Sequence, residues 1–422
     1  MALRAWLCLL MLGMGLCAFA PAFAQTPLPP AEMRGLWVVR TSILSPVAVA
    51  RVVAAAKAHH VNALFVQVRG RGDALYQSTL EPRAEELASQ PPDFDPLAEV
   101  VAQGHAAGLQ VHAWLNTCYV WNAGHRPLSP SHVVNAHPDW LARDARGHYA
   151  LSAVPGCEGA FLSPANPQAR RHIHDVFVDV ATRYDVDGIH LDYVRYAGAA
   201  YDYSDAALAG FRAQMQASAG PVDINLAEAR LHTDRLAYPH AFPGAWQDFR
   251  RQQVTDLVAA ISQDVKAVKP WIIVSAAVFA DRADAFSSRG QDWKTWLARG
   301  YLDAVVPMAY GVSTPQVARQ VRDAVACARE SGRFAYAGLG AWHISPESTL
   351  AKMGASRALG AQGTVLFSYG GMTGDGRTTR YLDTLAGRCW RAKVPVPLMP
   401  WLGARPSAAT SAAARAPNAG GG

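Results

Sequence analysis

The stretch Asp187–Tyr196, D-G-I-H-L-D-Y-V-R-Y, gathers polar side chains in a short segment with the alternation of a β-strand. Ile189 and Leu191 share one parity. His190 and Asp192 share the other, and in a strand the two pairs point to opposite faces. The polar face ends in a carboxylate, which is costly to bury without a purpose. We therefore interpret Asp192 as the centre of a chemical site in which a carboxyl group does acid–base work.

Eight short apolar segments alternate with helical segments and must position this carboxylate. The expected strands are Arg34–Arg40, Ala63–Arg69, Gln110–Asn116, the Asp187 stretch, Ile272–Val278, Ala304–Tyr310, Phe334–Gly340 and Thr364–Tyr369. This order predicts a (β/α)8 barrel of the TIM type. A doubly wound sheet is the alternative, and it would leave the count of eight unexplained.

The two longest insertions, 117–163 and 197–243, follow the third and fourth expected strands. Active sites of such barrels lie at the carboxyl ends of the strands, where the βα-loops are. Both insertions are therefore expected to overhang Asp192.

The first residues resemble a secretory signal rather than part of the fold. Arg4 precedes the apolar run Trp6–Phe19, and Ala22-Phe23-Ala24 supplies a cleavage pattern. Lipidation at Cys17 is the less favoured alternative. The expected division is a signal peptide at 1–24, a barrel domain at 25–402 and a disordered low-complexity tail at 403–422. We predict export to the periplasm, with no stable membrane insertion after cleavage.

The net charge of +6 is scattered along the chain rather than gathered in blocks. Nucleic acid is therefore not an expected partner, whereas a mild basic excess favours an anionic envelope polymer. Four cysteines follow the signal, at 118, 157, 327 and 389. An exported chain permits two disulfides. Cys118 with Cys157 is the preferred pair, and free buried thiols are an equally open alternative.

Several motifs stand in order between Glu32 and Tyr369, including M-R-G-L-W-V, F-V-Q-V-R-G-R-G-D-A-L-Y, G-L-Q-V-H-A-W-L-N, H-P-D-W-L, Y-D-V-D-G-I-H-L-D-Y-V-R-Y and L-D-A-V-V-P-M-A-Y. Together they resemble the glycosyl-hydrolase-like family 10, a family of bacterial, mostly exported proteins. The resemblance implies a barrel, glycoside hydrolysis, and a polysaccharide substrate such as peptide-stripped peptidoglycan strands. A cell-division partner is not identified by the sequence.

Glycoside hydrolysis usually needs two carboxyl groups. Asp192 is the expected first group, and an ion pair with Arg34 or Arg69 is its structural alternative. The candidates for the second group are Asp73, Glu158 and Asp281. Asp73 could instead orient Arg71, and Asp281 could be a turn or helix carboxylate. A non-catalytic carbohydrate-binding barrel is the alternative function, because no second carboxylate is obvious.

The same segment also partly resembles the D-G-x-D-x-D-x-E strand of glycoside hydrolase family 18. Here His190 replaces the middle aspartate and Val194 replaces the acid glutamate, so substrate-assisted chemistry of that form is not expected.

We expect substrate-binding side chains on the inward faces and ends of the strands. They are Arg34, Gln67, Arg69, Arg71, His112, Trp114, Asn116, His190, Tyr193, Arg195, Tyr310 and Tyr369. For His112 and His190, hydrogen bonding in the core is as open as a role in the site. No third ligand has convincing metal spacing, so neither a metal nor another cofactor is predicted.

Overall fold

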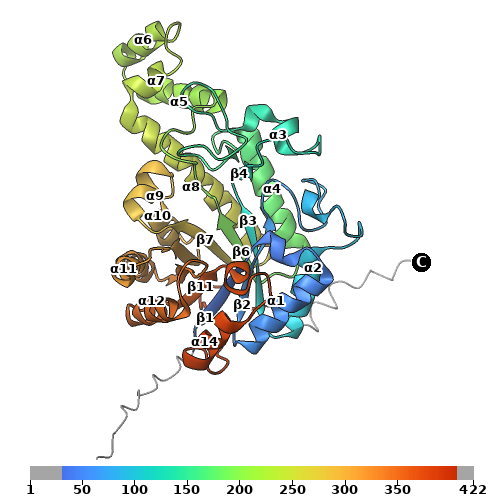
Figure 1. The fold of residues 1–422 in the computed structure, drawn as a ribbon. Coiled ribbons are helices and arrows are strands. Elements are labelled where there is room, and N and C mark those ends of the chain that lie inside the picture. Colours follow the sequence, from blue (N-terminus) through green and yellow to red (C-terminus); the bar gives the residue numbers. More distant parts are fainter. Residues whose placement is uncertain (1–30, 406–422) are drawn as a thin grey trace, which may run out of the picture.

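Parallel strands close into a barrel with helices outside it in the computed structural model, which describes residues 31–405 (Figure 1). The barrel strands are β1 (Met33–Val38), β2 (Ala63–Arg69), β3 (Gln110–Asn116), β6 (Gly188–Asp192), β7 (Ile273–Phe279), β8 (Ala304–Met308), β9 (Phe334–Ala335) with β10 (Ala337–Gly340), and β11 (Gly363–Phe367). β10 pairs with both β11 and β8, and this closes the ring. The predicted TIM-type barrel is confirmed.

A helix follows each barrel strand and packs outside the ring. These helices are α1 (Pro46–Ala58), α2 (Pro96–Ala106), α4 (Pro167–Arg183), α8 (Pro243–Val268), α10 (Trp293–Ala298), α11 (Thr314–Glu330), α12 (Pro346–Ala358) and α14 (Arg380–Arg388). Asp95 and Asn166 cap α2 and α4, with proline in the first turn of each helix. A capping side chain followed by proline satisfies free N–H groups and presets the helical backbone.

Alternating side chains divide the apolar core into two layers. Leu36 and Leu64 belong to the layer between strands and helices. Trp37, Phe65 and Trp114 belong to a separate inner cluster that fills the barrel. A period of two therefore fixes which side chains can reach the interior.

The insertions after β3 and β6 have their own structure. The first holds β4 (Tyr119–Trp121), α3 (Val133–Ala136), a 3₁₀ turn at Pro138–Trp140 and β5 (Ala160–Phe161), with β4 and β5 antiparallel. The second holds α5 (Asp205–Ser218), α6 (Pro221–Arg230) and α7 (Ala237–Ala241). These helices share a small core with the start of α8 and project from one side of the barrel (Figure 1).

Residues 391–405, which we call the strap, cross the amino ends of the barrel strands. The carbonyl oxygen of Pro395 accepts from the N–H of Glu32, just before β1. Met399 enters the inner core, and Arg405 contacts Asp187, just before β6. The strap thus covers the end of the barrel opposite the βα-loops.

The predicted signal peptide and all but the first three residues of the predicted tail lie outside the described residues. Over residues 31–405, no helix has the length and apolar character needed to cross a membrane.

Candidate active site

We call the end of the barrel at which the strands have their carboxyl ends the mouth. A cavity of about 540 Å³ opens there. It is lined by Trp37, Val39, Arg40, Gln67, Trp114, Asn116, Tyr119, Asn122, Asp192, Tyr193, Arg195, Ala277, Phe279, Met308, Tyr310, Trp342 and Phe367. Among the described residues that line it, Asp192 is the sole carboxylate. Its volume lies in the range of small-ligand sites.

Asp192 is the last residue of β6 and is 7% exposed. Its Oδ1 accepts a hydrogen bond from the backbone N–H of Tyr193 at 2.6 Å. Tyr193 has a φ of 49°, so the chain turns sharply as it leaves the strand. The turn leaves the Asp192 carboxyl group at the inner wall of the cavity.

Burial raises the pKa of Asp192 to about 6, and the negative charge of Glu158 acts in the same direction. The N–H of Tyr193 and the guanidinium of Arg195 oppose this rise. A carboxyl group with such a pKa can hold a proton near neutral pH and donate it, as a general acid must.

Amide side chains beside Asp192 are fixed by one another. Asn116 Oδ1 accepts from Trp114 Nε1 at 3.0 Å and from Gln67 Nε2 at 3.4 Å. Asn116 Nδ2 donates to the carbonyl oxygen of Gly70 at 2.7 Å. Three side chains predicted for this site therefore meet in one rigid group in the cavity wall.

Aromatic rings form the facing wall. Tyr310 stacks on Phe367 with ring centroids 5.7 Å apart. Trp342 packs edge-on against both, at 5.0 Å and 5.2 Å, and is nevertheless 44% exposed. Rings of this kind offer an apolar face with a polar rim, which suits the C–H faces of a sugar.

Arg195 is the most tightly held cation of the cavity. Its guanidinium lies 4.5 Å from the ring centroid of Tyr193 and 5.0 Å from that of Phe279. Its Nη2 donates to Glu158 Oε1 at 2.9 Å. Tyr193, Arg195 and Tyr310 thus join Asp192, as the sequence predicts.

Arg34 lies at the other end of the barrel, and the prediction that it binds substrate at the mouth is wrong. Its Nε donates to Glu32 Oε2 at 3.0 Å, and its Nη1 donates to the carbonyl oxygen of Ala392 in the strap at 2.6 Å. Alternation along a strand predicts which face a side chain lies on, but not how far along the strand it lies. Arg34 is the second residue of β1 and therefore lies at the amino end of the barrel, away from the mouth.

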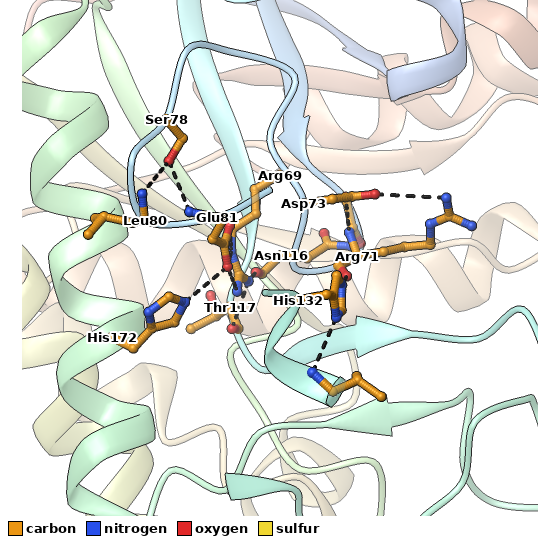
Figure 2. A network of polar contacts seen from close by, with 12 residues as sticks. Arg69, Arg71, Asp73, Ser78, Leu80, Glu81, Asn116, Thr117, His132 and His172 are labelled. Atoms are coloured by element: carbon orange, nitrogen blue, oxygen red, sulfur yellow. Dashed lines mark hydrogen bonds and ion pairs between the residues drawn. The ribbon is translucent and has the colours of Figure 1, made fainter. Parts of the chain in front are cut away.

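Arg69 is fully buried behind the cavity wall and does not line it. All three nitrogens of its guanidinium group have partners. Nε and Nη2 donate to Glu81, and Nη1 donates to the carbonyl oxygen of Thr117 at 3.1 Å (Figure 2). Glu81 also contacts His172 on α4 at 3.2 Å. Arg69 therefore ties the loop after β2 to the end of β3. This corrects the prediction that Arg69 binds substrate, because its side chain does not reach the cavity.

Asp73 and Arg71 belong to the same loop, beside Arg69 in Figure 2. Asp73 Oδ1 accepts from the backbone N–H of Arg71 at 2.9 Å, and burial raises its pKa. Arg71 Nη2 donates to Glu86 at 2.8 Å, and the same glutamate accepts from Arg40 Nε at 3.0 Å. Neither Asp73 nor Arg71 lines the cavity, but both belong to the group that holds Arg40, which does.

The two histidines lie in the barrel core beneath the cavity. His112 is stacked on Phe65 at 4.4 Å, and burial lowers its pKa to about 4. His190 Nε2 accepts from Trp37 Nε1 at 3.0 Å, so its Nδ1 carries the hydrogen that Ser275 Oγ accepts at 2.9 Å. Their positions correct the substrate-binding prediction: His190 supports Trp37, which lines the cavity, whereas His112 packs against Phe65 in the barrel core.

Two further candidates lie outside the cavity because their strands end early. β11 ends at Phe367, and Tyr369 begins the short helix α13 (Tyr369–Thr373) and lines a separate outer hollow. β7 ends at Phe279, and Asp281 is the exposed N-cap of α9 (Arg282–Ser288), accepting from Ala283 and Asp284. These positions support no role for either residue in the cavity.

All four cysteines of the described chain are free, so the preferred Cys118–Cys157 disulfide is not formed. Cys118 is part of the packed core, where burial raises the pKa of its thiol to about 12. Cys157 Sγ instead donates to the carbonyl oxygen of Gly159 at 3.0 Å. Nor do residues 31–405 contain a cluster of three or more His, Cys, Asp or Glu side chains placed to hold a metal ion.

The parallel barrel holds a buried carboxylate in an aromatic-lined cavity at the carboxyl ends of its strands, which is the usual place of the active site in a TIM barrel. A family model, glycosyl hydrolase-like 10, matches residues 32–333. The chain belongs to that family.

Two curated relatives are described as glycosyl hydrolases. Glycosyl hydrolase YngK of Bacillus subtilis is 27% identical over 273 residues, which is 59% of this chain and 46% of that protein. Glycosyl hydrolase DigH of Escherichia coli K12 is 25% identical over 349 residues, which is 71% of this chain and 70% of that protein. The chain thus spans less than half the length of the first of these relatives.

Solved structures show the same fold at low identity. The glycoside hydrolase domain of PgaB (BpsB) from Bordetella bronchiseptica matches with a TM-score of 0.59 and 19% identity, covering 84% of this chain and 99% of that one. The catalytic domain of β-amylase from Paenibacillus polymyxa matches with a TM-score of 0.60 and 14% identity, covering 86% and 100%.

Proposed function

We propose that this protein is an exported glycoside hydrolase that cleaves glycosidic bonds in a bacterial cell-wall glycan, with peptide-stripped peptidoglycan strands as the first substrate to test. One observation carries the proposal. A buried carboxyl group with a pKa of about 6, Asp192, lines an aromatic cavity at the mouth of a barrel in a glycosyl hydrolase-like family.

The cavity supplies the parts that cleavage needs. Asp192 protonates the oxygen of the leaving sugar, because burial keeps its proton available near neutral pH. Tyr310 and Trp342 offer ring faces to the sugar, and Asn116 holds the polar wall in place. The residues that accept the glycan therefore surround the proposed acid on two sides.

Export and the cell-wall substrate rest on the sequence. The signal pattern at residues 1–24 supports export to the periplasm, and the net charge of +6 favours an anionic polymer. No nucleic-acid or cofactor role enters the proposal, and a recruiting division protein is left open.

Digestion of defined glycans tests the proposal. The mature protein and its Asp192→Asn variant are incubated with intact sacculi and with amidase-stripped strands, and the products are read by mass spectrometry. We expect short disaccharide-repeat fragments from stripped strands with the wild type and none with the variant. Binding without product from any cell-wall glycan would contradict the proposal and favour a carbohydrate-binding barrel.

A further inference from the structure

The insertion after β3 contacts the mouth of the barrel through Glu158. Glu158 does not line the cavity, but it is hydrogen-bonded to a residue that does. Glu158 Oε1 accepts from Arg195 Nη2 at 2.9 Å, and Arg195 lines the cavity. Arg195 follows Asp192 by three residues, and its side chain is 4% exposed between aromatic rings. A clamped guanidinium therefore sets where the Glu158 carboxylate lies relative to Asp192.

The backbone around Glu158 also has a defined shape. Val154 and Cys157 exchange backbone hydrogen bonds across a tight turn that contains Gly156 at a φ of +81°. Gly159 has a φ of +150°, and a Cβ there would lie 2.1 Å from the carbonyl oxygen of Trp121. Since only glycine adopts these conformations easily, the turn presents Glu158 in one orientation.

One oxygen of Glu158 is left unused. The Glu158 side chain as a whole is 42% exposed, but its Oε2 atom is buried and has no hydrogen-bond partner among the described residues, whereas Oε1 is engaged by Arg195. By contrast, the buried Glu81 uses its carboxylate on Arg69 and His172. A buried acceptor without a partner is costly, and a water molecule or substrate group is what would satisfy it.

We infer that Glu158 is the second carboxyl group of the reaction and that it activates the attacking water through Oε2. The inference rests on the proposed glycoside hydrolysis. Glu158 is bonded to the lining residue Arg195 without lining the cavity itself, and a base set back from the sugar by one water molecule is the arrangement of an inverting enzyme.

The step balances with one water consumed. Asp192 gives its proton to the glycosidic oxygen, and the bond from that oxygen to the anomeric carbon breaks with its electron pair on the oxygen. The water oxygen bonds to the anomeric carbon, and its proton passes to Glu158. Solvent then returns a proton to Asp192 and removes one from Glu158.

Several groups face Asp192, and the direction in which each shifts its pKa predicts how the pH dependence of activity changes. Tyr193 N–H and Arg195 lower its pKa, whereas Glu158 raises it. The indole N–H of Trp114 also lowers the pKa of Asp192, and Tyr193 and Tyr310 lie close enough for the Asp192 charge to act on their hydroxyl groups. Removing the Glu158 charge therefore lowers the pKa of Asp192 and moves the alkaline limb of activity to lower pH.

The experiment compares Glu158→Gln with Glu228→Gln on stripped strands or a soluble fragment of them. Glu228 is a matched control, because it pairs with Arg212 at 2.6 Å on the remote helical projection. We expect kcat to fall by about 10²-fold or more in Glu158→Gln, with the alkaline limb shifted down, and to stay unchanged in Glu228→Gln. Azide should partly restore turnover in Glu158→Gln as a glycosyl azide, since it needs no base.

Two results would overturn the inference. One is a Glu158→Gln enzyme with kcat within a few-fold of the wild type at every pH. The other is retention of anomeric configuration, read by NMR of the first product of the wild type. An inactive wild type would instead overturn the proposed function, so the two failures are distinguishable.

Discussion

At the mouth of the barrel Arg195 pairs with Glu158 beside an open cavity, and at the opposite end Arg34 pairs with Glu32 beneath the strap. Both arginines are almost fully buried. The difference lies in what covers them. Arg34 donates to the carbonyl oxygen of Ala392 in the strap and lies over the ring of Trp390. Arg195 lies against the rings of Tyr193 and Phe279, which line the cavity. A buried charge thus serves stability at one end and is available for chemistry at the other.

Asp192→Asn is the change with the largest expected effect, and it affects the mouth alone. We expect kcat/KM on stripped strands to fall by about 10³-fold, the scale of losing a general acid. The free energy of unfolding at pH 7.5 should not fall, because the variant removes a buried charge. Steady-state kinetics measures the expected loss of kcat/KM, and urea unfolding measures the free energy of unfolding. An active variant would break the comparison.

Arg34→Met tests the opposite end. Removing one partner of a buried ion pair leaves Glu32 with Arg357 as a charged partner, at 2.7 Å. We expect the free energy of unfolding to fall by about 3 kcal/mol. The kcat/KM of the folded enzyme should stay within a factor of about two of the wild type, since Arg34 lies outside the cavity. A selective loss of kcat/KM would place Arg34 in the site after all.

The pH dependence of stability sharpens the assignment of the acid. The folded-state pKa of Asp192, about 6, lies above the usual aspartate value. The stabilisation that the protonated carboxyl group gives is therefore complete below about pH 4 and lost as the pH rises through about 6. Between these values the wild type should lose on the order of 2–3 kcal/mol relative to Asp192→Asn. Parallel curves for the two proteins would contradict the raised pKa.

Trp342→Ala should have the smallest effect. Trp342 is exposed at the mouth, and losing its ring face should raise KM by about 3- to 10-fold with kcat little changed. Trp401→Ala is the matched control at the strap, where Trp401 Nε1 donates to Asp303 Oδ1 at 2.8 Å. Its KM should equal that of the wild type. A similar rise in KM for both variants would indicate a general loss of structure instead.

Much of this architecture could be predicted from the sequence. The eight strands and their helices follow from apolar periodicity and helix-start pairs such as Asp95-Pro96. The face of the strand on which Asp192 lies follows from the alternation around it. The predictions for Arg34 and Tyr369 failed because a period of two shows which face of a strand a residue lies on, but not where the strand ends. Arg34 lies near the start of β1, and β11 ends before Tyr369.

The sequence by itself determined the barrel, the parity of its strands and the face of β6 that carries Asp192, because these depend on local spacing. The tertiary structure alone decided which polar groups share space. It placed the strap over Arg34, buried His112 and His190 in the barrel core, and brought Glu158 to Arg195 from 37 residues away in the chain. Such contacts depend on how loops close in three dimensions, and no periodicity along the chain records that closure.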